Sequence, residues 1–261
     1  MVTTIQPLAF FVEQIGGPYV QVEAMIPPGA NPHTYESTPG QMVNLSQAQM
    51  YVEIGTAFAF EKNWVPKLAS LNKNMRIVNA SVGISLIPMT EHQHDNDHHE
   101  QGEVDPHTWV SVGNAMVMAR TIEKNLCELD PGHASVYQAN AVNLLKQLGD
   151  LDKEIQQILA PLQQRAFYTY HPSWGYFAVE YHLDQVVIEN QGKEPTAREL
   201  QHVVEDAKAK GIKTIFVSPE FNSKSAQVIA KEIGGQVVSI EHLNKDFLNN
   251  LRDAAKAIAG Q

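Results

Sequence analysis

The chain has 261 residues, enough for one large domain or two modest ones, and its 43% hydrophobic and 18% charged residues are typical of a globular protein. A formal net charge of −10 argues against a nucleic-acid partner, because nucleic-acid phosphates need a basic surface. The single cysteine, Cys127, excludes an intrachain disulfide and a thiolate metal cluster.

The first part of the chain alternates short β-branched runs with helical patterns. Strands are expected at residues 2–5, 19–26, 50–54 and 76–80, and helices at residues 6–15, from Thr38 onward and at 60–71. Thr38 has the features of a helix cap, since Pro39 follows it and Gln41 stands three residues later. This βαβα order predicts a parallel sheet with helices on both faces.

The middle of the chain changes to helix, at residues 111–129 and then from Asp130 to about residue 160. The second helix carries an apolar stripe at steps of three and four, formed by Tyr137, Ala141, Leu144, Leu148, Leu151, Ile155, Ile158 and Leu162. At 1.5 Å per residue it would be about 40 Å long. The pattern alone leaves open whether this helix crosses two domains or packs within one.

Beyond Pro161 the βα order resumes. Strands are expected at residues 165–170, 185–188, 212–217 and 236–240, and helices from 174 to 181, from the capping residue Thr196 to 210, at 223–233 and at 246–259. The predicted fold is therefore α/β, with two lobes, each a mainly parallel four-stranded sheet with flanking helices, joined by one long helix. We expect an N-terminal lobe at 1–131, a linking helix at 132–161 and a C-terminal lobe at 162–261.

A His-rich loop at residues 91–102 interrupts the first lobe. It mixes acidic and amide side chains with His92, His94, His98 and His99. A short His-rich tract is a compositional signal for metal binding, but a solvated polar loop has the same composition. Both interpretations remain open.

Histidines also stand where predicted strands end. His33 follows the second strand through a Pro-Gly turn, His107 follows the fourth strand, His171 ends a strand of the second lobe and Glu241 ends the last strand. Ligands of open parallel sheets bind beyond the carboxyl ends of the strands. Each histidine taken singly is more often a surface or core residue, but the three with one carboxylate could close a four-coordinate Zn²⁺ site.

Several segments resemble a known family. These are PPGANPHTYE at 27–36, EVDPHTW at 103–109, YHPSWGYFAVEYHL at 170–183 and GKEPTARELQ at 192–201, with a looser match at 239–252. They are similar to the cluster A-I, or cluster 9, substrate-binding proteins of ATP-driven zinc and manganese importers, in particular the high-affinity zinc uptake protein A-like branch. The resemblance implies two α/β lobes joined by one long helix, and no enzyme activity.

The resemblance also implies a site and a role. His33, His107 and His171 would be metal ligands, with Zn²⁺ captured between the lobes as the transported ligand. Relatives typically place an Asp in a segment like IDPL where this chain has Glu241, so Glu241 is the expected fourth ligand, with His242 or a water as alternatives. The partner would be the membrane permease of an ABC importer, and the protein a periplasmic or otherwise extracytoplasmic monomer.

The start of the chain has no signal peptide before Val2, and no apolar run approaches the roughly 20 residues of a membrane helix. We expect a mature form whose leader has been removed, and a lipid anchor is compatible with this.

Further residues and functions stay open. Glu36, Tyr35 and Trp174 could support the ligands, although packing or capping explains each as well. The manganese- or iron-binding branch is an alternative, but it places a carboxylate where His171 stands. A zinc hydrolase is a weaker alternative, because no HExxH motif is present. An adhesin or a regulator of metal supply is compatible with the same fold.

Overall fold

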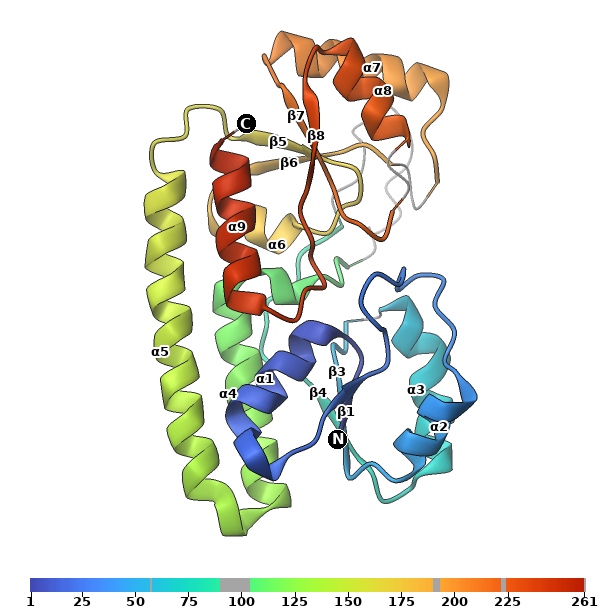
Figure 1. The fold of residues 1–261 in the computed structure, drawn as a ribbon, viewed down its shortest axis with the longest axis vertical. Helices are drawn as coiled ribbons and strands as arrows, with labels where there is room; N and C mark the ends of the chain where they lie inside the picture. Colours follow the sequence, from blue (N-terminus) through green and yellow to red (C-terminus); the bar gives the residue numbers. More distant parts are fainter. Residues whose placement is uncertain (57, 90–103, 190–192, 222–223, 261) are drawn as a thin grey trace. The chain divides into compact units, whose positions relative to one another are not determined.

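The computed structural model describes residues 1–56, 58–89, 104–189, 193–221 and 224–260 (Figure 1). The chain forms two compact units. Unit 1 comprises Met1–Ser85, Ser111–Asp152 and Leu243–Leu248, and unit 2 comprises Leu86–Val110, Lys153–His242 and Asn249–Gln261. The division at residues 131 and 161 expected from the sequence stays a prediction.

The sheet of unit 1 has four parallel strands in the order β2-β1-β3-β4. Their bounds are β1 Val2–Thr3, β2 Glu23–Ala24, β3 Met50–Glu53 and β4 Arg76–Asn79. The strand expected over residues 19–26 is much shorter than predicted. Gly17 has a φ of 55° and is followed by Pro18, which cannot donate a hydrogen bond, so the chain first turns through the 3₁₀ helix Gly17–Tyr19.

Helices lie on both sides of this sheet. In Figure 1, α1 (Gln6–Gly16) and α4 (Val112–Leu129) lie on one side, and α2 (Pro39–Ser46) and α3 (Ala59–Leu71) on the other. Thr38 caps α2 through a capping box with Gln41, as predicted. Phe11 on α1 packs against Phe247 with ring centroids 4.8 Å apart, which ties the segment 243–248 into the core of unit 1.

The long helix is α5, Ala134–Leu159, of 26 residues. It follows the 3₁₀ helix Pro131–His133, where the Asp130 carboxylate accepts hydrogen bonds from His133 Nδ1 and the Tyr137 hydroxyl, both at 2.7 Å. The predicted apolar stripe is buried from Tyr137 to Ile155. The boundary between the two units falls within α5, after Asp152.

The sheet of unit 2 is also parallel, in the order β6-β5-β7-β8. Its strands are β5 Ala166–Thr169, β6 Asp184–Val187, β7 Thr214–Val217 and β8 Gln236–Ser239, and the helices that follow them are α6 Gly175–Glu180, α7 Ala197–Ala209, α8 Lys224–Glu232 and α9 Phe247–Ala259. Tyr168 packs with residues of α7 and α8, whereas the next residue back, Phe167, contacts Phe216. This alternation covers both faces of the sheet, and the two four-stranded parallel sheets confirm the predicted fold class.

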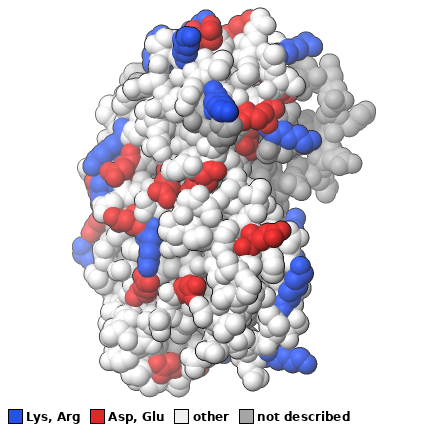
Figure 2. All heavy atoms as spheres, turned by 45° about the vertical axis from the view of Figure 1, so that its right-hand side comes forward, with Lys and Arg blue, Asp and Glu red and all other residues white. Residues whose placement is uncertain are grey.

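Charges of both signs are mixed on the face of the molecule that Figure 2 draws. On the face drawn in Figure 2, Lys and Arg side chains are interspersed with Asp and Glu, and no large patch of one sign forms among the described residues. None of the helices in the described ranges combines the length and apolar character required to cross a bilayer.

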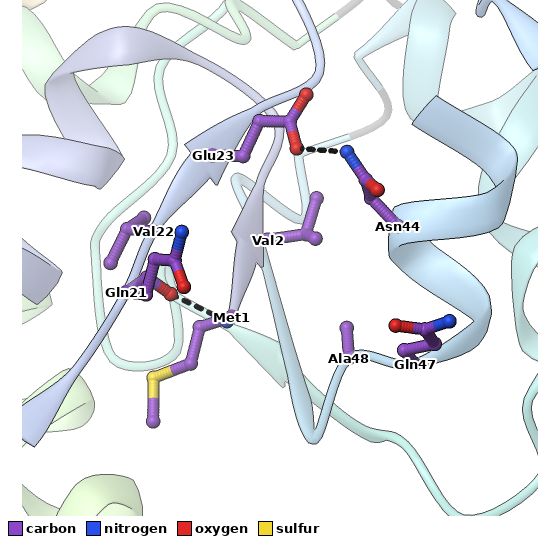
Figure 3. A pocket seen from close by; sticks show the side chains of 8 residues that line it. All are labelled: Met1, Val2, Gln21, Val22, Glu23, Asn44, Gln47 and Ala48. Atoms are coloured by element: carbon purple, nitrogen blue, oxygen red, sulfur yellow. Dashed lines mark hydrogen bonds between the residues drawn. The ribbon is translucent and has the colours of Figure 1, made fainter. Parts of the chain in front are cut away.

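A pocket of about 250 Å³ opens in unit 1 (Figure 3). It is lined by Met1, Val2, Gln21, Val22, Glu23, Asn44, Gln47 and Ala48. The lining residues come from the beginnings of β1 and β2 and from the end of α2, and ligands of parallel sheets bind at the opposite ends of the strands. Its one carboxylate, on Glu23, accepts a hydrogen bond from Asn44 at 2.7 Å. The pocket lacks the donor set of a metal site.

Candidate metal centre

Four polar side chains of unit 2 stand at the carboxyl ends of its four strands. His171 follows β5, Glu189 follows β6, Ser218 follows β7 and His242 follows β8. Backbone pairing continues past the strand ends, since the amide of Tyr170 donates to Phe216 and that of Ile240 to Val217. Residues beyond the strands are therefore held in register, and this end of the sheet is where a ligand is expected.

His107 reaches the same place from the segment before the 3₁₀ helix Thr108–Val110. Its backbone amide donates to Asp105 Oδ1 at 2.8 Å, across the rigid Pro106. The side chains of Asp105 and His107 are both fully buried. Gly175 at the start of α6 permits this packing, because a Cβ there would lie 2.4 Å from Asp105 Oδ2.

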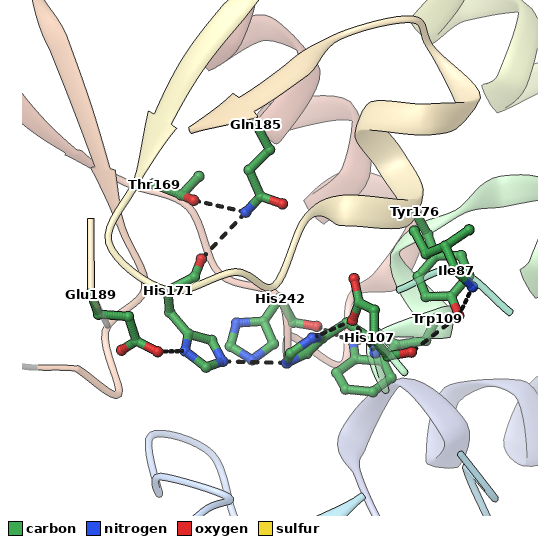
Figure 4. Close-up of polar contacts among 10 residues, drawn as sticks. Ile87, His107, Trp109, Thr169, His171, Tyr176, Gln185, Glu189 and His242 are labelled. Atoms are coloured by element: carbon green, nitrogen blue, oxygen red, sulfur yellow. Dashed lines mark hydrogen bonds and ion pairs between the residues drawn. The ribbon is translucent and has the colours of Figure 1, made fainter. Parts of the chain in front are cut away.

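The two imidazoles of His107 and His171 face each other. Each Nδ1 is bonded to a carboxylate oxygen at 2.7 Å, from Asp105 for His107 and from Glu189 for His171 (Figure 4). An ionised carboxylate only accepts, so it fixes the hydrogen on Nδ1 and leaves the lone pair on Nε2. The two Nε2 atoms lie 3.3 Å apart. Two lone pairs therefore point at one place.

The separation of the two Nε2 atoms matches that of two ligands of one metal ion. Two nitrogens that bind one tetrahedral zinc at about 2.0–2.1 Å lie about 3.3–3.4 Å apart. Carboxylate–histidine pairs of this kind orient metal ligands and raise their basicity. Neutral imidazole is a common ligand of zinc, copper, iron and nickel, so the pair can hold a borderline divalent metal.

Aromatic and polar residues of unit 2 fix the imidazoles in place. Phe221 stacks on His171 with centroids 4.3 Å apart, and Trp109 meets the edge of the His107 ring at 5.3 Å. Gln185 donates to Thr169 Oγ1 at 2.7 Å and to the carbonyl of His171 at 3.4 Å. These contacts limit the rotation of both rings, so metal binding would cost little further side-chain conformational entropy.

The structure brings His242 to the pair. Its ring is 2% exposed and lies with its centroid 5.6 Å from His107 and 6.1 Å from His171. Glu241, the expected fourth ligand, is partly exposed, and its backbone carbonyl accepts from Asn250 at 2.5 Å. Burial raises the pKa of the nearby Glu220, and Glu241 adds to the rise.

His33 belongs to unit 1. It is exposed in the turn after Pro32, where its amide donates to Asn31 Oδ1 at 2.9 Å and its ring lies 6.3 Å from that of Phe58. Its role as a ligand stays a prediction. The loop histidines His92, His94, His98 and His99 lie outside the described residues.

Of the residues expected to support the ligands, Tyr35 donates to Gln41 at 2.9 Å, Glu36 is exposed and Trp174 packs edge-on against Phe177. Sequence reasoning missed the two carboxylates that orient the histidines. Asp105 carries a usable signal, because it stands two residues before His107 in the DPH motif. Glu189 follows a predicted strand end, which is the same signal that selected the histidines.

The fold is that of an α/β protein with two parallel sheets, and its buried pair of histidines has a geometry that suits a divalent metal. The family model for the zinc-uptake complex component A, periplasmic, matches residues 1–261. The chain therefore belongs to this family. It is 31% identical over 260 residues to the high-affinity zinc uptake system protein ZnuA of Bacillus subtilis (strain 168), which covers 94% of this chain and 80% of that protein.

Solved structures agree with the assignment. The crystal structure of ZnuA has a TM-score of 0.92 and 39% identity, over 99% of this chain and 97% of the other. A zinc-bound ZnuA with residues 138–173 of its own numbering deleted has a TM-score of 0.91 and 39% identity, over 99% and 95% of the two chains. The family is one of solute-binding components of zinc uptake systems.

Proposed function

We propose that this protein captures Zn²⁺ outside the cytoplasm and delivers it to the membrane permease of an ABC-type importer. The observation that carries the proposal is the pair of buried Nε2 atoms 3.3 Å apart, each on an imidazole oriented by a carboxylate. Membership of the zinc-uptake family supports the transport role, and the zinc-bound relative supports zinc as the cargo.

The ligands of this proposal are His107 and His171 in unit 2 and His33 in unit 1. The NPHTYE and DPHTW motifs support His33 and His107. Glu241 is the expected fourth ligand, with His242 or a water as alternatives. A set of imidazoles favours zinc, whereas Mn²⁺ and Fe²⁺ are better served by oxygen ligands, so the manganese- or iron-binding alternative is the weaker one.

Binding without catalysis is the expected activity, since the family consists of solute-binding components. We propose a monomer in the periplasm or attached to the outer face of the membrane. The His-rich loop would supply additional, weaker zinc sites that gather metal near the main one. Deleting residues 91–102 should then lower the number of zinc ions bound without weakening the tight site, and an unchanged number would refute this role.

Uptake of radioactive zinc by cells of the source organism tests delivery. Cells that lack the gene should accumulate less zinc, and the unaltered gene should restore uptake. His171→Ala should fail to restore it, whereas His202→Ala, an exposed histidine on α7, should restore it fully. Normal uptake with His171→Ala, or manganese uptake restored in place of zinc, would overturn the proposal.

A further inference from the structure

His242 gives unit 2 a third buried imidazole beside the oriented pair. We propose that His242 is a metal ligand, and that His107, His171 and His242 allow unit 2 to capture the ion without His33. This inference rests on the proposed function, because it concerns the same cargo. It adds a ligand that the IDPL pattern of the family does not supply.

The separations among the three rings suit one ion. Imidazoles that bind a tetrahedral zinc through Nε2 at about 2.0–2.1 Å have ring centroids about 5.2 Å apart. His107 and His171 have this separation, 5.2 Å, and His242 lies 5.6 and 6.1 Å from them. Figure 4 shows the three rings grouped at this end of the sheet. The His242 ring is therefore about 0.4 and 0.9 Å further from the two rings than a third ligand of the same ion would be.

Contacts within unit 2 hold His242 in this orientation. The indole N–H of Trp109 donates to the His242 carbonyl at 2.6 Å, and Ser218 Oγ lies 3.1 Å from His242 Nδ1. Ser218 also donates to Glu220. With Nδ1 engaged by Ser218, Nε2 is the ligand atom. Trp109 thereby connects the segment that carries His107 to the segment that carries His242.

The neighbouring Glu241 is the competing ligand. The two neighbours differ in burial and in their distance from the pair. The His242 ring is 2% exposed and within 6.1 Å of both imidazoles, whereas Glu241 is partly exposed and close enough to Glu220 to raise the pKa of that carboxyl. Three imidazoles without a carboxylate also give a softer ligand set, which disfavours manganese.

Metal competition against a chromophoric chelator tests the inference on the full-length, metal-stripped protein. His33→Ala should still bind one zinc ion, with a higher Kd. His242→Ala should raise the zinc Kd at least about tenfold, which is about 1.4 kcal/mol. The double variant, with both His33→Ala and His242→Ala, should lose tight zinc binding. Glu241→Gln distinguishes the two candidates for the fourth ligand, because it should weaken zinc binding only if Glu241 is the ligand. His202→Ala, an exposed histidine on α7, is the control that should bind as the parent does.

Cobalt substitution supplies a second measurement that a merely structural role would not move. Loss of one nitrogen ligand in His242→Ala should change the energy and intensity of the visible Co²⁺ bands, while the thermal midpoint shows that the variant is folded. A parental Kd and spectrum in His242→Ala, or a loss confined to Glu241→Gln, would overturn the inference. Absence of tight zinc binding by the parent protein would instead refute the proposed function.

Discussion

The carboxylate of Asp105 controls the orientation of His107, and replacing it is a sharp perturbation of the metal centre. Asp105 Oδ1 accepts from both the amide and Nδ1 of His107, at 2.8 and 2.7 Å, and the side chain is fully buried. Asp105→Asn preserves the shape of the side chain but removes its negative charge. We therefore expect weaker zinc binding by a folded protein.

The size of the effect follows from the position of the charge. The carboxylate would lie about 7 Å from a zinc ion held on His107 Nε2 at the usual Zn–N length. Coulomb's law then gives an attraction between the carboxylate and the doubly charged zinc ion of about 1 kcal/mol in a water-like medium and about 5 kcal/mol at an effective dielectric constant of 20. Loss of a group that orients a ligating histidine typically costs about 10–100-fold in affinity, or about 1.4–2.7 kcal/mol. A rise in Kd within that range is expected.

Chelator competition measures this Kd directly, and thermal unfolding of the metal-free protein verifies the fold. Asp150→Asn is the matched control, because Asp150 makes an exposed ion pair with Lys146 at 2.7 Å on α5. Zinc binding by Asp105→Asn as tight as that of Asp150→Asn would refute the argument that the carboxylate orients the ligand.

Three further predictions concern stability. Gly149→Ala in α5 should raise the free energy of unfolding by about 0.5–1 kcal/mol, because the new Cβ meets its nearest atom at 3.7 Å; a lower thermal midpoint would contradict this. Thr196→Ala should lower it by about 1 kcal/mol, since the Glu199 amide loses its cap, and urea denaturation with no change in midpoint would count against it. Burial raises the pKa of Glu61 from 4.5 to about 7, so the folded protein holds this proton more tightly than the unfolded chain, and stability is lost as the pH rises through that window. Glu61→Gln should remove on the order of 2–4 kcal/mol of this fall, whereas parallel stability profiles of the two proteins would show that Glu61 does not titrate there.

Much of the fold follows from local patterns in the sequence. Thr38 and Thr196 start helices as predicted, because a hydroxyl cap with Gln or Glu three residues later satisfies the first amides of a helix locally. The strand expected over residues 19–26 is confined to Glu23–Ala24, because Gly17 and Pro18 redirect the backbone before pairing begins. The β propensity of residues 19–26 favours a strand, but the turn that begins at Gly17 shortens it.

The centre itself was only partly predictable. The strand-end rule selected His171 together with His107, and the structure places their Nε2 atoms 3.3 Å apart. The same rule applies to Glu189, which follows the predicted strand at 185–188, but a carboxylate at a strand end does not by itself show which histidine it orients. The choice between Glu241 and His242 as a ligand stays a prediction, since the direction of their side chains depends on how the chain leaves β8. Tertiary contacts such as that of Trp109 with His242 determine this direction.

Calorimetric titration of metal-stripped protein with zinc, beside His107→Ala and with manganese as competitor, would show whether the buried histidines hold zinc. The parent protein should bind zinc tightly even in excess manganese, and tight binding should be lost in His107→Ala. Equal zinc affinity in the two proteins, or displacement of zinc by manganese, would contradict it.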